Sequence, residues 1–159
     1  MSARVVEVRP LQRADADACD AIVLSLPYHF GHEGGRRECA AAVRTQSGLV
    51  AVVDGEVAGF LTVARHYPAA AEITWMAVRS DHRRRGLGGQ LVARLCGQLR
   101  NEGRRLVLVL TVSASDPGPE PDDGYGSTRR FYSANGFLEA RDLPGYWDRD
   151  TPVVMVRPL

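Results

Sequence analysis

Residues 81–91 read DHRRRGLGGQL and combine the residue types and spacing that bind an anion. Three arginines run into a segment with three glycines in four positions, and a leucine-rich helical pattern follows. The first turn of a helix leaves N–H groups unpaired, and the helix dipole adds about half a positive charge there. Glycine lets a phosphate approach the backbone, and arginine adds a charged fork of donors. The stretch therefore predicts a phosphate or pyrophosphate site formed by Arg83, Arg84, Arg85, Gly86, Leu87, Gly88 and Gly89.

Two common phosphate-binding loops do not fit this stretch. A P-loop needs Gly-Lys-Ser/Thr, and all 20 basic residues of the chain are arginine. A dinucleotide-binding fingerprint needs a third glycine where the chain has Leu91. It also needs an acid about 20 residues later, where the chain reads LTV. A solvated basic corner, with glycines that pack the helix, is the alternative interpretation of these residues.

The composition indicates one globular domain, residues 1–159, with 45% hydrophobic and 25% charged residues. A net charge of +1 provides no general basic field, so we expect no nucleic-acid partner. The cysteines Cys19, Cys39 and Cys96 are odd in number and lack metal-type spacing, which predicts buried, reduced thiols. No apolar signal core opens the chain, and no apolar run approaches the ~20 residues of a membrane span. We therefore expect a cytoplasmic protein without a membrane partner.

Hydrophobic periodicity predicts a chain in which helices and strands are interspersed. Asp54 and Gly55 have the residue types of a tight hairpin turn, and Gly103 is a helix stop signal. The predicted strands cover 4–10, 49–53, 56–67, 71–79, 104–112, 136–143 and 152–159; the predicted helices cover 13–26, 36–46, 86–102 and 127–135, the last with Ser127 as its cap. The pattern predicts an α/β fold with a mixed, mostly antiparallel sheet.

Three motifs in the expected order resemble the GNAT superfamily of N-acetyltransferases. The fragment Arg83–Gly88 fits R/Q-x-x-G-x-G/A, the coenzyme A pyrophosphate loop of that family. The preceding EITWMAV resembles the strand before this loop, and STRRFYSANGF resembles a later helix in which a tyrosine precedes a G-F pair. The order of elements also resembles the GNAT fold from end to end. One departure concerns an asparagine that many members carry before the later helix. Here the region reads DDGYGST, with Tyr125 or Thr128 near that place.

The resemblance implies a single-domain GNAT-like fold with about seven strands, about four helices and a V-shaped gap between strands 4 and 5. It implies acetyl-CoA as co-substrate and no metal. The backbone of Met76, Ala77 and Val78 would hold the pantetheine arm, and the Met76 N–H would stabilise the oxyanion.

The resemblance also implies how protons move. Glu72 matches the general base of the histone-acetylating branch, and alternation along a strand predicts that Glu72 and Met76 point to the same side. His29, His32, Glu33 and His66 are alternative bases. Tyr132 matches the general-acid tyrosine of the family, and Ser115 is a weaker substitute.

Acids and aromatic residues near the expected acceptor site favour a cationic amine. The loop 113–126 contains four acids, and DLPGYWDRD adds three more beside two aromatic residues. The predicted substrate-binding residues are His29, Phe30, Glu33, Tyr146 and Trp147. Solvated loops are the alternative interpretation of both segments.

The expected activity is acetyl-CoA-dependent transfer of an acetyl group directly to a primary amine, with a small cationic molecule favoured as acceptor. Two alternatives stay open. One is a catalytically silent acyl-CoA-binding regulatory or sensor domain, and the other is a protein N-terminal or lysine acetyltransferase. The protein is expected to be a monomer or a homodimer.

Overall fold

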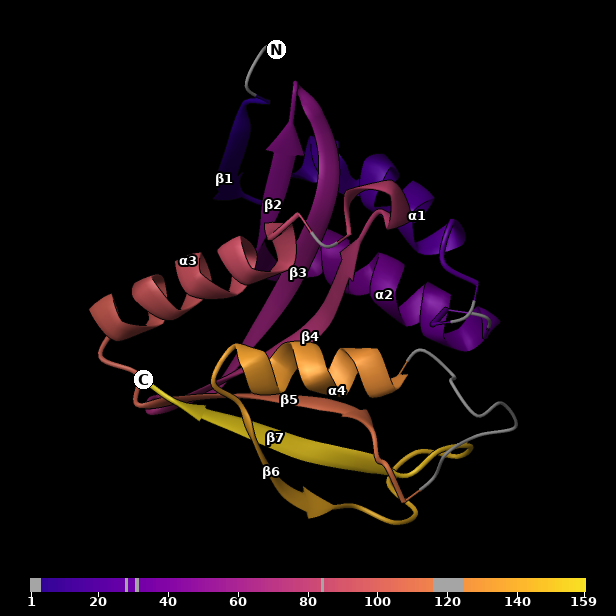
Figure 1. Ribbon diagram of the computed structural model, residues 1–159, viewed down its shortest axis with the longest axis vertical. Coiled ribbons are helices and arrows are strands. Elements are labelled where there is room, and N and C mark those ends of the chain that lie inside the picture. Colours follow the sequence, from indigo (N-terminus) through magenta and orange to yellow (C-terminus); the bar gives the residue numbers. More distant parts are fainter. Residues whose placement is uncertain (1–3, 28, 31, 84, 116–124) are drawn as a thin grey trace. The chain divides into compact units, whose positions relative to one another are not determined.

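The computed structural model describes residues 4–27, 29–30, 32–83, 85–115 and 125–159 (Figure 1). Contacts within the chain divide it into two compact units. The first unit comprises Met1–Ala64 and Thr74–Gln98, and the second comprises Arg65–Ile73 and Leu99–Leu159.

Seven strands form one sheet in the order β1-β2-β3-β4-β5-β7-β6 (Figure 1). Their bounds are β1 Val6–Pro10, β2 Ser47–Val53, β3 Glu56–Tyr67, β4 Ala70–Val78, β5 Leu106–Val112, β6 Leu138–Asp142 and β7 Pro152–Pro158. Strand β4 pairs with β5 in parallel, whereas β1 with β2, β2 with β3, β5 with β7 and β6 with β7 pair antiparallel. The predicted mixed, mostly antiparallel sheet is confirmed, as are four α-helices among the described residues.

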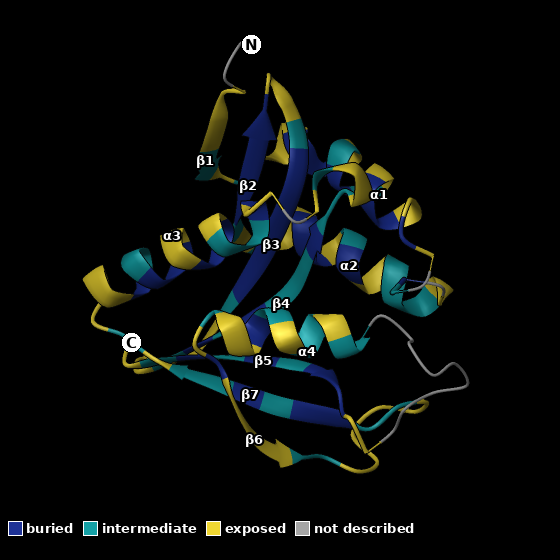
Figure 2. Ribbon diagram, viewed as in Figure 1, coloured by how far each residue is buried: buried dark blue, intermediate teal, exposed yellow. Residues whose placement is uncertain are grey.

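In the first unit, helices α1 Ala16–Leu24 and α2 Glu33–Thr45 cover one face of β2 and β3. Their core is apolar and joins helix and strand residues; it includes Ile22, Val23, Cys39, Val43, Val50, Val52 and Phe60. Figure 2 colours buried residues dark blue, and much of β2 and β3 has that colour. The turn between β2 and β3 is at Asp54 and Gly55, with φ of 50° and 85°. Both residues have the positive φ of a tight hairpin turn, as predicted.

Helix α3 Leu87–Asn101 buries the predicted leucine stripe. Leu87, Leu91, Leu95 and Leu99 are all 3% exposed or less. The helix ends before Gly103, whose φ of 81° fits the left-handed residue that closes many helices.

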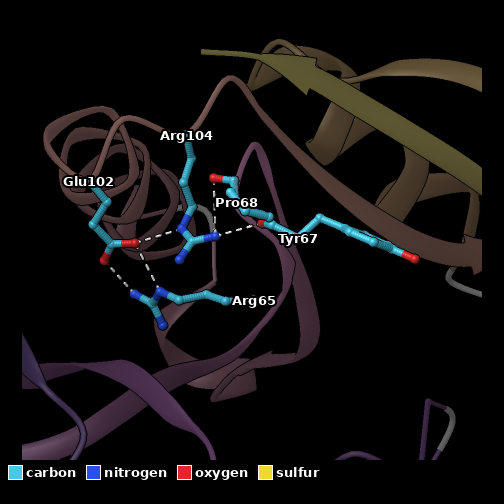
Figure 3. A network of polar contacts seen from close by, with 5 residues as sticks. All are labelled: Arg65, Tyr67, Pro68, Glu102 and Arg104. Carbon is cyan, nitrogen blue, oxygen red and sulfur yellow. Dashed lines mark hydrogen bonds and ion pairs between the residues drawn. The ribbon is translucent and has the colours of Figure 1, made fainter.

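In the second unit, helix α4 Tyr125–Ala134 packs on β5 and β6. The parallel ladder runs from Ala70 opposite Leu106 to Ile73 opposite Val109. A polar network ties the end of α3 to the β3–β4 turn (Figure 3). Glu102 accepts hydrogen bonds from Arg65 at 2.9 and 2.7 Å and from Arg104 at 2.7 Å, and Arg104 donates to the carbonyl of Tyr67 at 2.8 Å. The V-shaped gap between β4 and β5 stays a prediction.

The starts of three helices differ from the sequence prediction by two or three residues. Helix α2 begins at Glu33, three residues before the predicted start at 36, because His32 acts as its N-cap: its Nδ1 accepts from the Gly34 N–H at 3.1 Å. Histidine is not among the usual cap residues, which explains the late predicted start. Helix α4 begins at Tyr125, so the predicted cap at Ser127 is wrong. The helix predicted over 13–26 is a short 3₁₀ turn at 13–15 followed by α1.

The cysteine prediction is confirmed, because Cys19, Cys39 and Cys96 are free and buried. Burial raises the pKa of Cys19 and of Cys39 to about 12. Neither thiol therefore ionises near neutral pH. Within the described residues, no helix has the length and apolar character needed to cross a membrane.

Candidate active site

The predicted anion loop joins β4 to α3 and is open to solvent. A 3₁₀ turn, Ser80–His82, follows β4, and Arg83 and Arg85 are exposed. Arg84 lies outside the described residues. Gly86 has a φ of +78°, and its carbonyl accepts the Gln90 N–H at 3.0 Å, which starts the helical ladder.

The space beside this loop suits a phosphate. A Cβ built at Gly86 would have no described heavy atom within 4 Å. Gly88 and Gly89 are half-buried in the first turn of α3. The Leu87 side chain is buried, which leaves only its backbone for a ligand. The loop thus offers helix N–H groups, two described guanidinium groups and open space to one anion.

Side chains do not alternate regularly along β4. Thr74 Oγ1 donates to Gln46 Oε1 at 2.5 Å and accepts from Thr62 Oγ1 at 2.7 Å, on the face that α1 and α2 cover. The next residue, Trp75, packs on the core of that same face, with its ring centroid 6.0 Å from that of Phe30. Two consecutive residues therefore share a face.

The opposite face of β4 is reached at Val78. A Cβ built at Gly59 would lie 3.2 Å from Val78 Cγ2 and 3.5 Å from Leu91 Cδ1, so Val78 faces α3. Ala77 belongs to the core under α1 and α2. By alternation, Met76 shares the α3 face with Val78. The prediction that Glu72 and Met76 point to the same side assumed that side chains alternate regularly along β4. That alternation is broken at Thr74 and Trp75.

The structure brings together two residues that the sequence analysis treated as alternatives. His66 Nε2 lies 2.8 Å from Glu72 Oε1. The His66 side chain is 51% exposed and the Glu72 side chain 22% exposed. The sequence contained one signal for this contact, the short turn at Pro68, which returns the chain so that the ends of β3 and β4 meet.

Tyr132 lies in the second unit and is buried. Its ring makes edge contacts with Phe131 and Phe137, at centroid distances of 5.2 and 5.3 Å. Burial raises the pKa of its phenol well above the ordinary value of 10. The group therefore stays protonated at neutral pH, which is the state that a proton donor needs.

Ser115, the weaker substitute for Tyr132, is engaged elsewhere. Its hydroxyl donates to Asp142 Oδ2 at 2.7 Å, and the Ser113 hydroxyl donates to Asp142 Oδ1 at 2.7 Å. These bonds, from Ser113 first and then Ser115, hold the pKa of Asp142 below its usual range. The three residues fix the start of the loop 113–126 to the end of β6.

The predicted acceptor residues differ in what they can offer a ligand. In the first unit, Phe30 is buried in the core, His29 is half-buried and Glu33 is exposed, where it pairs with Arg37 at 3.1 Å. In the second unit, Tyr146 is 65% and Trp147 36% exposed. The acids Asp116, Glu120, Asp122 and Asp123 lie outside the described residues.

The sequence analysis did not name two further residues of the first unit as possible site residues. The ring of Trp75 packs against that of Phe30 at a tilt of 34°, and Gln46 accepts the hydrogen bond of Thr74. Trp75 lies inside the EITWMAV motif, and its large side chain was the feature of the sequence that could have pointed to it. Gln46 follows the last residue of α2 and carried no signal, because its partner is 28 residues away.

The comparisons with known proteins agree with this arrangement. Residues 16–119 match the acetyltransferase (GNAT) family. No curated protein matches the chain significantly. A GNAT-family structure from Desulfovibrio desulfuricans superposes with a TM-score of 0.80 at 22% identity, covering 97% of this chain and 99% of that one. The ribosomal-protein-S18-alanine N-acetyltransferase of Escherichia coli gives 0.77 at 18%, covering 97% and 94%. An aminoglycoside 6′-N-acetyltransferase complexed with coenzyme A gives 0.72 at 18%, covering 96% of each chain.

The chain belongs to the GNAT family of acetyltransferases, because the family matches well over half of its length. It is therefore an acetyltransferase. The solved relatives act on different acceptors, an aminoglycoside in one case and the alanine of a ribosomal protein in another. Among the described residues, no group of three or more His, Cys, Asp or Glu side chains could hold a metal ion.

Proposed function

We propose that residues 1–159 form one acetyltransferase domain that transfers the acetyl group of acetyl-CoA directly to a primary amine, with a small cationic molecule as acceptor. The observation that carries the proposal is the open loop at the start of α3, where Gly86 has a positive φ and no described atom fills the space beside it. In a GNAT chain, an exposed arginine-rich loop that leads into a helix supports pyrophosphate binding at this place.

The donor would be held by backbone groups and arginines. Arg83, Arg84 and Arg85 neutralise the pyrophosphate, and the N–H groups of 86–89 bind its oxygens. Leu87 contributes its backbone only, because its side chain is buried. The backbone of 76–78 holds the pantetheine arm, and the Met76 N–H binds the carbonyl oxygen as charge develops on it.

Transfer requires a proton acceptor, because a lysine-type amine has a pKa of about 10.4 and its neutralisation at pH 7 costs roughly 4–5 kcal/mol. The contact between Glu72 and His66 supports this role for the pair. Four residues of strand from Glu72 to Met76 span about 13 Å, so we propose that a chain of waters carries the proton to the pair. Tyr132, kept protonated by burial, donates to the leaving thiolate.

The acceptor residues that we propose are Tyr146 and Trp147, whose rings are exposed in the second unit, and His29 and Glu33 in the first unit. Phe30 acts from the core by supporting Trp75. Aromatic faces and carboxylates attract ammonium groups, which supports a cationic acceptor. A protein N-terminus is the second candidate acceptor, because the Escherichia coli relative acts on the alanine of a ribosomal protein.

The test is a thiol-release assay with acetyl-CoA and three acceptor sets: small cationic amines, neutral amines and peptides with free N-termini. The proposal predicts turnover with the first set. Gly88→Asp is the matched variant, because aspartate suits the first turn of a helix while its charge repels phosphate. It should remain folded and lose acetyl-CoA binding. Acetyl-CoA binding without turnover on any amine would favour the sensor alternative, and turnover on peptides alone would favour the second acceptor.

A further inference from the structure

We propose that His66 is the catalytic residue that accepts the amine proton, and that Glu72 is a positioning residue that orients the His66 ring. The inference rests on the proposed function and assigns a role within the pair that the sequence analysis left as alternatives. The observation that carries it is the 2.8 Å contact between His66 Nε2 and Glu72 Oε1.

The contact fixes the tautomer of the ring. An ionised carboxylate can only accept hydrogen bonds, so the proton of this bond belongs to His66 Nε2. A neutral imidazole carries one N–H, so Nδ1 then has the free lone pair. The same carboxylate–imidazole arrangement orients the base in serine hydrolases, where the carboxylate also stabilises the imidazolium that forms.

The exposure of the two side chains agrees with His66 as the base and Glu72 as the residue that positions it. His66 is 51% exposed and Glu72 is 22% exposed, so the ring is the outer partner and the carboxylate the inner one. An acceptor amine or a bridging water reaches the ring more readily. One carboxylate oxygen is already occupied by the ring.

The other charged groups near this turn are engaged with one another. Arg65, the neighbour of His66 in β3, donates to Glu102 through Nε and Nη2, and Arg104 bonds Glu102 and the carbonyls of 67 and 68. Adjacent strand residues point to opposite faces, so Arg65 is turned away from the His66 ring. Among the described contacts, the charge that meets His66 is the Glu72 carboxylate.

The proton balance closes without an external reagent. His66 Nδ1 takes one proton from the substrate ammonium through a chain of waters, and the ring becomes an imidazolium. The freed amine lone pair forms the C–N bond as the C–S bond breaks, and Tyr132 protonates the thiolate. The nitrogen loses a second proton after the C–N bond has formed, and a proton from solvent returns Tyr132 to its protonated state. The half-exposed ring of His66 then releases its proton to solvent, so one proton is released in each turnover.

Three variants separate the two roles. In His66→Gln, the amide can still donate to Glu72, but no base remains. In Glu72→Gln, the amide oxygen can still accept from Nε2 and keep the ring oriented. His66→Ala opens the half-exposed site to imidazole added in solution. Glu102→Gln is the matched control, since this glutamate contacts only structural arginines among the described contacts.

The proposal predicts that kcat falls about 10²–10⁴-fold in His66→Gln, the contribution of a general base, and falls less in Glu72→Gln. Imidazole should restore turnover in His66→Ala and leave the wild type and Glu102→Gln unchanged. The assignment is overturned if Glu72→Gln is the more damaged variant and imidazole has no effect, or if neither variant loses kcat. Failure of the wild type to release thiol with any amine would instead overturn the proposed function.

Discussion

Replacing Gly86 by alanine separates two possible roles of this glycine. One is its backbone conformation, and the other is the space that it leaves for an anion. Gly86 has a φ of +78°, in the left-handed region. That conformation costs an alanine roughly 1–2 kcal/mol. In a chain of this length, each kcal/mol lowers Tm by about 2–4 °C, so Tm should fall by about 2–8 °C. No described atom lies within 4 Å of the new Cβ, so no clash inside the protein adds to this loss.

The same methyl group has a second effect if the loop binds a pyrophosphate. It would occupy the space through which the phosphate approaches the backbone. We expect the Kd for acetyl-CoA to rise at least about tenfold, equivalent to about 1.4 kcal/mol. The assay is calorimetric titration with acetyl-CoA, beside thermal unfolding in the same buffer.

Gly103→Ala is the matched control, because Gly103 follows the other end of the same helix. Its φ is +81°, and no described atom lies within 4 Å of a Cβ built there. Both variants should lose similar stability, and Gly103→Ala should bind acetyl-CoA as the wild type does. Equal Kd values for the two variants would refute the reasoning, since Gly86 would then matter only for its backbone conformation.

Two further predictions concern the second unit. Tyr132→Phe should lower kcat by about 10²-fold or more, as measured by thiol release. The acetyl-CoA Kd should stay close to that of the wild type, because the ring contacts with Phe131 and Phe137 remain. An unchanged kcat would remove Tyr132 from the mechanism. Hydrogen bonds from Arg65 and then Arg104 lower the pKa of Glu102 from 4.5 to about 2, so its contribution to stability is complete above pH 4.5 and is lost as pH falls toward 2. Because the Glu102 side chain is 35% exposed, Glu102→Gln should lower the free energy of unfolding by only about 0.2–1 kcal/mol at pH 7 and by less at pH 3. Urea unfolding at both pH values measures this difference. A loss of stability that is larger at pH 3 than at pH 7 would contradict the prediction.

Local sequence patterns predicted the fold well where residue types and hydrophobic periodicity indicate the same structure. The Asp54–Gly55 turn has the two positive φ values that its residue types favour, and the leucine stripe of α3 is buried as its spacing requires. The parallel pairing of β4 and β5 is consistent with the GNAT resemblance. The start of α2 was missed because His32 replaces a usual cap and two glycines follow it, both of which argue locally against a helix.

The candidate site was predicted less completely, because its geometry depends on contacts between residues distant in sequence. The periodicity of β4 gave no sign that Thr74 and Trp75 share a face, since Gln46 and Phe30 draw them there from other elements. The contact of His66 with Glu72 depends on how β3 and β4 meet after their turn. The anion loop was the exception: its residues are contiguous, so its chemistry could be predicted without any pairing.

We propose above that residues 83–89 bind the pyrophosphate of acetyl-CoA during acetyl transfer. The most direct measurement compares kcat/KM for acetyl-CoA with kcat/KM for S-acetylpantetheine, a donor that carries the same thioester and lacks the pyrophosphate, in the wild type and in Gly88→Asp. We expect the wild type to prefer acetyl-CoA by about 10²-fold or more, roughly the contribution of two charge-assisted contacts, and Gly88→Asp to lose this preference while still using S-acetylpantetheine. Equal kcat/KM values for the two donors in the wild type, or an undiminished preference in the variant, would contradict it.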